Sequence, residues 1–257
     1  MTLIELMVSV TLMTFIVLGL YQVFDATQKA MRNGANQVDA TETGRSTMGI
    51  LLRDLEQAAS SGSTNINLDL FDPGYLNNVV TLLPSGVEAT NIDQEMFFLK
   101  KGQHWTGVGY LCLPTKNPLV DDDLSLAGIR SLYRFETETN ILELMDDNLL
   151  NKFTDVNGRL GRLNKVAEGV VNFSIKVLTN GVLMTNMLGE AQTTLQLSNQ
   201  APSHLDLELS LIDPEVMDEI RNIPNSTAIS NYLYRLPASF QVYNSRVRVP
   251  AGAINFQ

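Results

Sequence analysis

The chain begins with a long apolar stretch, Met1 to Phe24, in which Glu5 is the only charged side chain. A helix of about twenty apolar residues spans the hydrocarbon core of a bilayer. On an insertion scale, strongly apolar residues contribute about −0.3 to −0.6 kcal/mol each, whereas a charge at mid-membrane costs about 2.5 to 3.5 kcal/mol. The many apolar residues outweigh one charge near the helix end, so the pattern predicts a helix that inserts into a membrane.

From Asp25 to about Ser61 the pattern becomes that of an amphipathic helix. Apolar or small residues recur about every 3.5 residues, and polar residues occupy the other faces. Ser60-Ser61-Gly62-Ser63 is a signal for the helix to stop. At 1.5 Å per residue the whole helix is about 90 Å long; its apolar half, 1–24, is expected to project, and its second half, 25–61, to lie on a sheet. The alternative is a membrane anchor followed by a separate helix, with hinges at Gly19 and Gly34. The recurring positions are Met31, Gly34, Val38, Thr41, Met48, Leu52, Leu55 and Ala59.

The remainder of the chain contains short strand signals separated by turn residues. Residues 62–135 are expected to hold a connecting loop and the first strands, and residues 136–257 an antiparallel sheet with a short helix near 213–222. That helix is predicted from Asp213-Pro214-Glu215, an N-cap, a first-turn proline and an acidic first turn. A hairpin turn is predicted at Glu138-Thr139-Asn140, and further helical turns at 226–235. The predicted strands are 79–83, 96–99, 108–113, 129–135, 141–145, 170–177, 205–211, 240–243 and 246–249.

The clearest strand signal is the alternation from Leu205 to Leu211. Its leucines share one face, while Asp206, Glu208 and Ser210 share the other. Such alternation is typical of an antiparallel strand covered on one side only, and a helix is the natural cover. The pattern therefore predicts an α+β fold in which a long N-terminal helix packs on an antiparallel sheet.

The start of the chain resembles a known family. Thr2-Leu3-Ile4-Glu5-Leu6-Met7-Val8 is similar to the mature N-terminus of type IV pilins and type II secretion pseudopilins. In that family a short basic leader is removed by a prepilin peptidase, which also methylates the new N-terminal residue; here that residue is Met1, where the family usually has Phe. The resemblance implies a pilin fold and a filament subunit, with Met1, Thr2 and Glu5 as assembly residues.

Other features resemble the larger minor pilins and the J-type minor pseudopilins more than the short major pilins. These are the chain length, the tract Arg53-Asp54-Leu55-Glu56-Gln57-Ala58, and the stretches 168–173 and 202–205. The main subunit of a less familiar filament remains an alternative. Many pilins close a C-terminal loop with two cysteines, but this chain has only Cys112, which we expect to be buried and inert.

Glu5 is the residue on which the functional prediction depends. A carboxylate in hydrocarbon must find a counter-charge or take up a proton, because an isolated buried charge is very costly. In a helical filament the N-terminal amine of one subunit can approach Glu5 of the next, and buried polar pairs of this kind set register in coiled coils. The alternative is that the carboxylate reaches to the membrane surface while the helix stays a simple anchor.

Composition and motifs narrow the function further. The net charge of −10 argues against nucleic acid as a general partner, because phosphate binding requires a basic face. No nucleophile motif, glycine-rich phosphate loop or spaced metal-ligand set occurs in the sequence, so we predict neither an enzyme nor a cofactor. The acidic run Asp121-Asp122-Asp123 is a weak candidate for binding Ca²⁺, and a solvated acidic turn is the favoured interpretation.

Three functions are therefore weighed. The first is a structural subunit of a pilus-like filament, extracellular or periplasmic, which resides in the inner membrane before assembly. Its partners would be other copies or related pilins, the prepilin peptidase and an assembly platform. The second is a singly anchored envelope protein that binds a ligand and never polymerises. The third is a membrane-tethered enzyme, which the missing catalytic residues disfavour.

Overall fold

The computed structural model covers a chain that divides into two compact units, Met1–Asp39 and Ala40–Gln257, and we refer to the second unit as the head. Each unit is described by itself. The residues that the structure describes are 2–59, 68–71, 80–82, 88–90, 93–102, 104–116, 122–139, 148–159, 161–179, 182–183, 195–197, 204–235 and 240–249.

Helix α1 (Leu3–Glu56) is one continuous helix, and it runs through both Gly19 and Gly34 without a break. The alternative of two separate helices is therefore wrong. The helix ends before the predicted stop near Ser61. Its last turn closes with hydrogen bonds from Gln57 N to Asp54 O and from Ala58 N to Leu55 O, and the next amide, Ala59 N, donates to Leu99 O at 2.8 Å. The backbone has thus left the helix to hydrogen-bond with the sheet.

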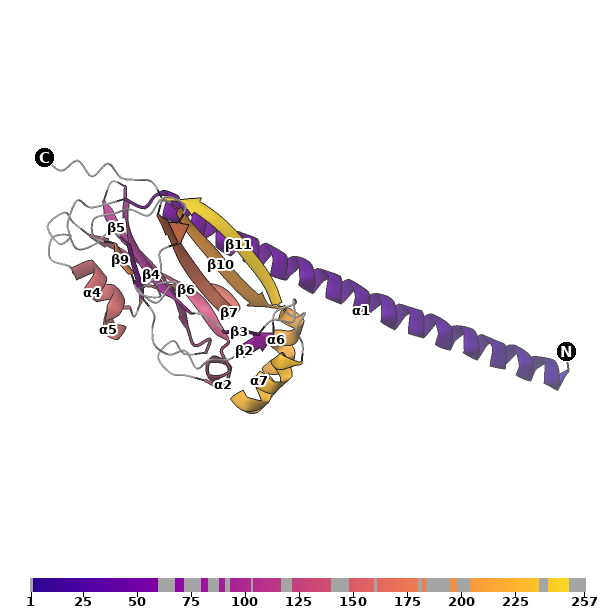
Figure 1. The fold of residues 1–257 in the computed structure, drawn as a ribbon. Coiled ribbons are helices and arrows are strands. Elements are labelled where there is room, and N and C mark those ends of the chain that lie inside the picture. The colour runs from indigo at the N-terminus through magenta and orange to yellow at the C-terminus, as the bar shows by residue number, and fades with distance from the viewer. Residues whose placement is uncertain are drawn as a thin grey trace, which may run out of the picture. The chain divides into compact units, whose positions relative to one another are not determined.

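The head is built on an antiparallel sheet (Figure 1), in which the strands follow the order β11-β10-β7-β6-β5-β4-β1-β9, with β8 paired to β7. Strands β2 and β3 form a separate hairpin. The α+β class predicted from the sequence is confirmed. The strands of the main sheet are β1 (Leu68–Phe71), β4 (Glu95–Lys101), β5 (Trp105–Leu113), β6 (Arg130–Thr139), β7 (Leu163–Thr179), β8 (Val182–Leu183), β9 (Leu195–Leu197), β10 (His204–Ile212) and β11 (Phe240–Arg248); the hairpin strands are β2 (Val80–Leu82) and β3 (Glu88–Thr90).

Two strand predictions are wrong in detail. The hairpin turn expected at Glu138-Thr139 is instead the end of β6, because Glu138 and Thr139 continue to pair with Thr106 and Trp105 of β5. The two short strands expected at 240–243 and 246–249 form one strand, since all nine residues of β11 pair with β10. Asn140 and the predicted strand 141–145 lie outside the described residues.

The head also contains short helices: α2 (Asp123–Leu126), α4 (Asn148–Thr154), α5 (Val156–Arg159), α6 (Pro214–Ile220) and α7 (Ser226–Tyr234). The predicted start of α6 at Asp213-Pro214 is confirmed, but Asp213 makes no side-chain cap. Its carboxylate instead accepts a hydrogen bond from Gln241 of β11 at 2.8 Å. Asn225 does cap α7, accepting from Ala228 N at 2.7 Å.

One face of the sheet packs against the end of α1. Met48, Leu51 and Leu55 of the helix share a core with the alternate leucines of β10, which confirms the predicted helical cover. Because successive strand residues point to opposite faces, Tyr110 and Cys112 of β5 face this same core. Cys112 is buried, as the sequence predicts.

The opposite face is covered by the short helices at two places. Helices α2, α6 and α7 cover one hydrophobic cluster, which includes Ile212 at the end of β10. Helix α4 covers a second cluster through Leu149 and Phe153. The prediction of a wet β10 face therefore holds for Asp206 and Glu208, which are half-buried, but is wrong for Ser210, which is 3% exposed.

Glycine allows α4 to approach the sheet closely. A Cβ atom on Gly109 of β5 would stand 2.3 Å from the ring of Phe153, and one on Gly107 would stand 2.9 Å from the ring of Phe97. The two phenylalanine rings pack with their centroids 5.2 Å apart. The glycines of this strand thus serve packing under α4.

Candidate assembly site

The first part of α1 is the most unusual surface of the described chain. Residues Leu3–Arg32 have a mean hydropathy of 2.3 over their most apolar window and are not buried at all within the chain. By length and composition this segment is able to cross a membrane or to act as a signal sequence. A monomeric soluble protein rarely exposes so large a continuous apolar surface, because large apolar patches mark contacts with other proteins or membranes.

The structure brings two of the predicted assembly residues together. The backbone N–H of Thr2 donates to Glu5 Oε2 at 3.2 Å, across the first turn of α1. This is half of a capping box, in which the acidic residue three positions after the N-cap satisfies the N-cap amide. The pattern Thr-x-x-Glu was readable from the sequence, but the sequence prediction missed this local role. Met1 lies outside the described residues, so its contact with Glu5 stays a prediction.

The hydroxyl groups in the apolar segment are satisfied within the helix itself. Ser9, Thr11 and Thr14 each donate to the carbonyl four residues earlier, at 2.8 Å. Such bonds let hydroxyl residues reside in an apolar helix without a partner from elsewhere. Glu5 differs from them, because a backbone amide supplies a hydrogen bond but no positive charge.

One of the weak metal candidates, Asp122, has a structural role. Asp122 is the N-cap of α2, and its Oδ1 accepts from Ser125 N at 2.9 Å in a capping box. Asp121 lies outside the described residues. Among the described residues no three His, Cys, Asp or Glu side chains are grouped so that they could hold a metal ion.

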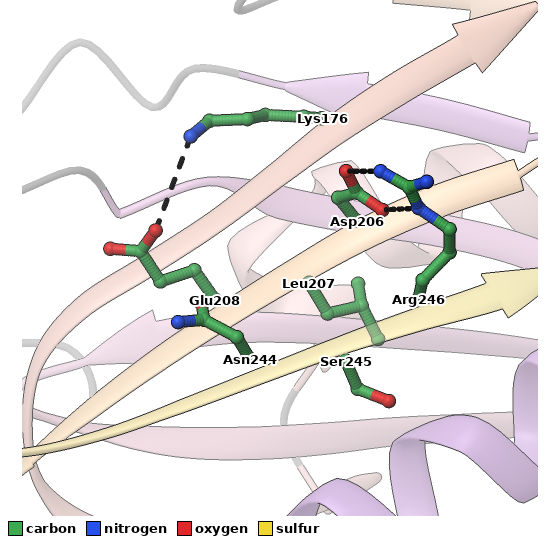
Figure 2. A pocket seen from close by; sticks show the side chains of 7 residues that line it. All are labelled: Lys176, Asp206, Leu207, Glu208, Asn244, Ser245 and Arg246. Atoms are coloured by element: carbon green, nitrogen blue, oxygen red, sulfur yellow. Dashed lines mark hydrogen bonds and ion pairs between the residues drawn. The ribbon is translucent and has the colours of Figure 1, made fainter. Parts of the chain in front are cut away.

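A shallow polar depression of about 450 Å³ lies on the outer face of β7, β10 and β11 (Figure 2). Its charges are already paired. Arg246 donates to both oxygens of Asp206, at 2.6 and 2.7 Å, and Glu208 accepts from Asn172 at 2.8 Å and lies 4.0 Å from Lys176. The side chains form a self-satisfied, solvated ladder across three strands, with no surplus charge to attract a ligand.

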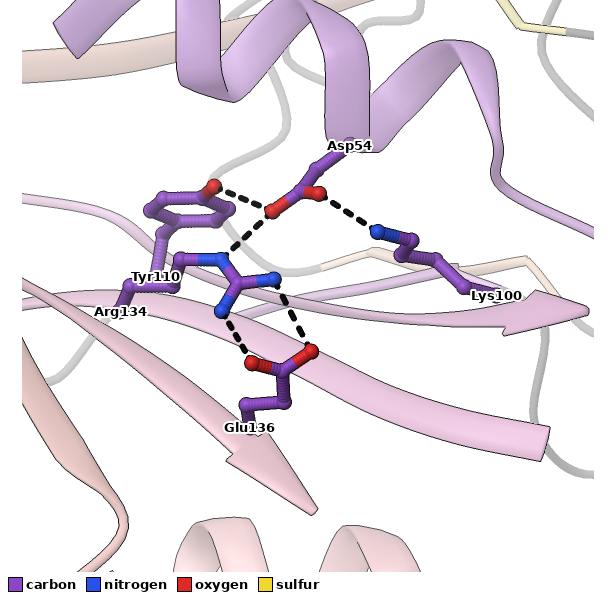
Figure 3. A network of polar contacts seen from close by, with 5 residues as sticks. All are labelled: Asp54, Lys100, Tyr110, Arg134 and Glu136. Carbon is purple, nitrogen blue, oxygen red and sulfur yellow. Dashed lines mark hydrogen bonds and ion pairs between the residues drawn. The ribbon is translucent and has the colours of Figure 1, made fainter. Parts of the chain in front are cut away.

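A second polar network attaches the end of α1 to the sheet (Figure 3), and we call it the clamp: Asp54, Lys100, Tyr110, Arg134 and Glu136. Asp54 accepts hydrogen bonds from Lys100 Nζ at 2.7 Å, from Tyr110 Oη at 2.7 Å and from Arg134 Nε at 2.6 Å. Arg134 also donates to both carboxylate oxygens of Glu136. Three strands thereby hold one carboxylate of the helix.

The clamp changes the titration of its members. Burial of Asp54 opposes its ionisation, but the hydrogen bonds from Arg134, Lys100 and Tyr110 outweigh burial and lower its pKa. Burial and the hydrogen bond to Asp54 raise the pKa of Tyr110 well above its usual value. The ionised form of Asp54 and the neutral form of Tyr110 are therefore both favoured at neutral pH.

Comparison with protein-family models finds no match for this chain, and comparison with curated proteins finds none either. The architecture is pilin-like: a long helix with an apolar N-terminal part, whose end packs on an antiparallel sheet.

Proposed function

We propose that the chain is a structural subunit of a helical filament of the type IV pilin kind. The observation that carries the proposal is the segment Leu3–Arg32, a fully exposed apolar helix whose only acidic residue before Asp25 is Glu5. Bundling of such helices would remove their apolar surface from water, at about 25 cal/mol per Å². Identical subunits joined head to tail by a contact that does not close into a ring would produce a filament.

In this proposal Glu5 supplies the specificity of assembly. Inside a bundle of apolar helices its charge requires a counter-charge, and the hydrogen bond from Thr2 N–H provides none. The N-terminal amine of a neighbouring copy is the cation that the assembly itself would place there. Pairing would also set the axial register, because any other register would leave the carboxylate buried without its partner.

The same proposal covers where the subunit resides before assembly and how its N-terminus is processed. The apolar segment would hold it in the inner membrane until assembly, and the partners would be other copies or related pilins, a prepilin peptidase and an assembly platform. The filament would be extracellular or periplasmic, and Met1 would carry the methyl group. No enzymatic activity is proposed. The mass of the purified N-terminal peptide tests the processing step: it should be one methyl group heavier than the unmodified peptide starting at Met1.

Two substitutions separate the roles of Glu5. Glu5→Gln keeps a side-chain oxygen that can accept from Thr2 N–H but removes the charge, whereas Glu5→Ala removes both. Asp25→Asn is the matched control, because Asp25 is an exposed carboxylate that forms an ion pair with Lys29 at 3.1 Å. Each protein would be expressed in the native host. Electron microscopy would count filaments, and membrane fractionation would confirm insertion.

We expect Asp25→Asn to assemble like the wild type, and both Glu5 variants to insert into the membrane without forming regular filaments. Normal filaments with Glu5→Gln but none with Glu5→Ala would reduce Glu5 to a helix cap and overturn its charge-pairing role. A wild-type protein that stays dispersed, as single particles in the membrane, would overturn the filament itself and favour an anchored, non-polymerising protein.

A further inference from the structure

Three consecutive polar residues at the start of β4 are buried in the head. Asp93, Gln94 and Glu95 are 4%, 4% and 8% exposed. They tie this point of the chain to β7: Gln94 N donates to Phe173 O at 3.0 Å, and Ile175 N donates to Gln94 Oε1 at 2.5 Å. We call these three residues the β4 entry.

The charges of the β4 entry are unequally satisfied. Glu95 meets Arg159 of α5 at 2.8 and 3.4 Å. Within the described part of the chain, Asp93 has one contact with a cation, Oδ2 to Arg130 Nη1 at 3.4 Å, although both side chains are more than nine-tenths buried. Asp93 Oδ1 and Arg130 Nε have no hydrogen-bond partner among the described residues. An ionised carboxylate in this position is desolvated without full compensation.

We propose that Asp93 and Arg130 form an acid-closed latch, which holds the β4 entry on β7 more tightly when Asp93 is protonated than when it is ionised. The proposal does not depend on the filament function. Protonation takes one proton from solvent and removes the uncompensated negative charge from the interior. When Asp93 is protonated, the positive charge of Arg130 on β6 still interacts with the negative charge of Glu95.

The electrostatic environment supports this direction. Burial raises the pKa of Asp93 to about 6, and the attraction of Arg130 opposes the rise only in part. The other titratable groups that face this site are Glu95 of β4 and Cys112 of β5. Burial raises the pKa of Glu95 against the pull of Arg159, and burial together with the charge of Asp93 raises that of the Cys112 thiol. From β7 the β4 entry meets the backbone of Phe173 and Ile175.

The direction of the pH dependence follows from the difference between the pKa of Asp93 in the closed form and in the open form. When the β4 entry opens and Asp93 meets water, its pKa returns toward the ordinary value of 3.8. The closed form therefore binds a proton more strongly than the open form, so closure is favoured as the pH falls through about 6 and opening is favoured as it rises. Local opening of this kind is visible in amide exchange, because the amides of the opened segment lose protection.

The test is hydrogen exchange of the full chain in detergent, at about pH 5 and about pH 7.5, with each rate corrected for the intrinsic pH dependence of exchange. The amides of Gln94 and Ile175 report on the latch directly. The sole cysteine, Cys112, gives a second readout through its rate of reaction with a dithiodipyridine. Asp93→Asn removes the titration, and Asp206→Asn, on the exposed face of β10, is the control for loss of a carboxylate.

We expect Gln94 and Ile175 to be protected more strongly at the lower pH, by about tenfold, because a pKa of about 6 in the closed form and 3.8 in the open form differ in proton binding by this factor between the two pH values. Asp206→Asn should keep this dependence, and Asp93→Asn should lose it, with protection at about pH 7.5 close to that of the wild type at about pH 5. Equal or weaker protection of the wild type at the lower pH would overturn the proposal without any variant. So would a pH dependence that persists in Asp93→Asn.

Discussion

The head buries two aspartates in opposite ways. Asp54, at the end of α1, is 5% exposed and accepts hydrogen bonds from three donors on three strands. Asp93, at the β4 entry, is 4% exposed and has a single contact with Arg130 at 3.4 Å. Although their exposed fractions are nearly equal, the pKa of Asp54 is lowered by its hydrogen bonds and that of Asp93 is raised by burial. The difference teaches that hydrogen-bond donors around a buried carboxylate can outweigh the cost of its burial, and that a carboxylate without them favours its protonated form.

The largest expected effect is at the clamp. Asp54→Asn leaves Lys100 and Arg134 facing an uncharged amide in a buried site, and breaking a buried ionic network by removing one partner costs roughly 3–5 kcal/mol. We expect the free energy of unfolding of the head to fall by about this amount. Denaturant unfolding at about pH 7.5, followed by the fluorescence of the only tryptophan, Trp105, measures it.

The control for the clamp is Glu136→Gln. Glu136 contacts the same Arg134, but its side chain is 42% exposed, so its loss should cost no more than about 1 kcal/mol. Similar losses for Asp54→Asn and Glu136→Gln would contradict the central position of Asp54 in the clamp.

The pH dependence of stability should show both aspartates. The folded-state pKa of Asp54 is depressed, so its contribution is present above its unfolded pKa and is lost as the pH falls through the folded value. The folded-state pKa of Asp93 is raised to about 6, so its contribution is present below 3.8 and is lost as the pH rises through about 6. The shift of Asp93 corresponds to about 3 kcal/mol.

The substitution Asp93→Asn separates the contribution of Asp93 to the pH dependence of stability from that of Asp54. The substitution should flatten the stability profile of the head between about pH 4 and pH 7 and leave the loss at lower pH unchanged. Unfolding curves at several pH values check this, and an unchanged slope between about pH 4 and pH 7 would show that Asp93 does not titrate in that range. Unlike the exchange experiment on the β4 entry, this measurement reports on global unfolding.

The elements of the head were largely predictable, but the contrast between the two aspartates was not. The alternation from Leu205 to Leu211 and the Asp213-Pro214 start of α6 are local patterns, and both were predicted correctly. The donors of Asp54 lie 46, 56 and 80 residues along the chain, so no local pattern announces them. The polar run Asp93-Gln94-Glu95 has no strand signal of its own, and its burial follows only from the approach of β6, β7 and α5.

The candidate assembly site at the N-terminus also has features that the sequence predicts and one that it does not. The exposed apolar helix follows from composition alone, and the hydrogen bond between Thr2 and Glu5 follows from a spacing of three residues. A contact between Glu5 and the amine of another copy belongs to an assembly, and nothing within one chain determines its geometry. The sequence therefore predicts the apolar surface and the acidic residue, whereas the pairing would come only from the proposed filament.

The smallest expected effect concerns the packing that accompanies the clamp on the same face of the sheet. A Cβ atom on Gly44 of α1 would stand 2.1 Å from the ring of Tyr243 on β11, whereas one on Gly49 would meet nothing within 4 Å. Gly44→Ala must therefore displace the tyrosine ring, and overpacking of this kind costs about 1–3 kcal/mol. Gly49→Ala adds a better helix former at an open position and should stabilise by up to about 1 kcal/mol. Denaturant unfolding of the two variants side by side should give shifts of opposite sign. Equal stabilisation by both would mean that α1 does not lie this close to β11 at Gly44.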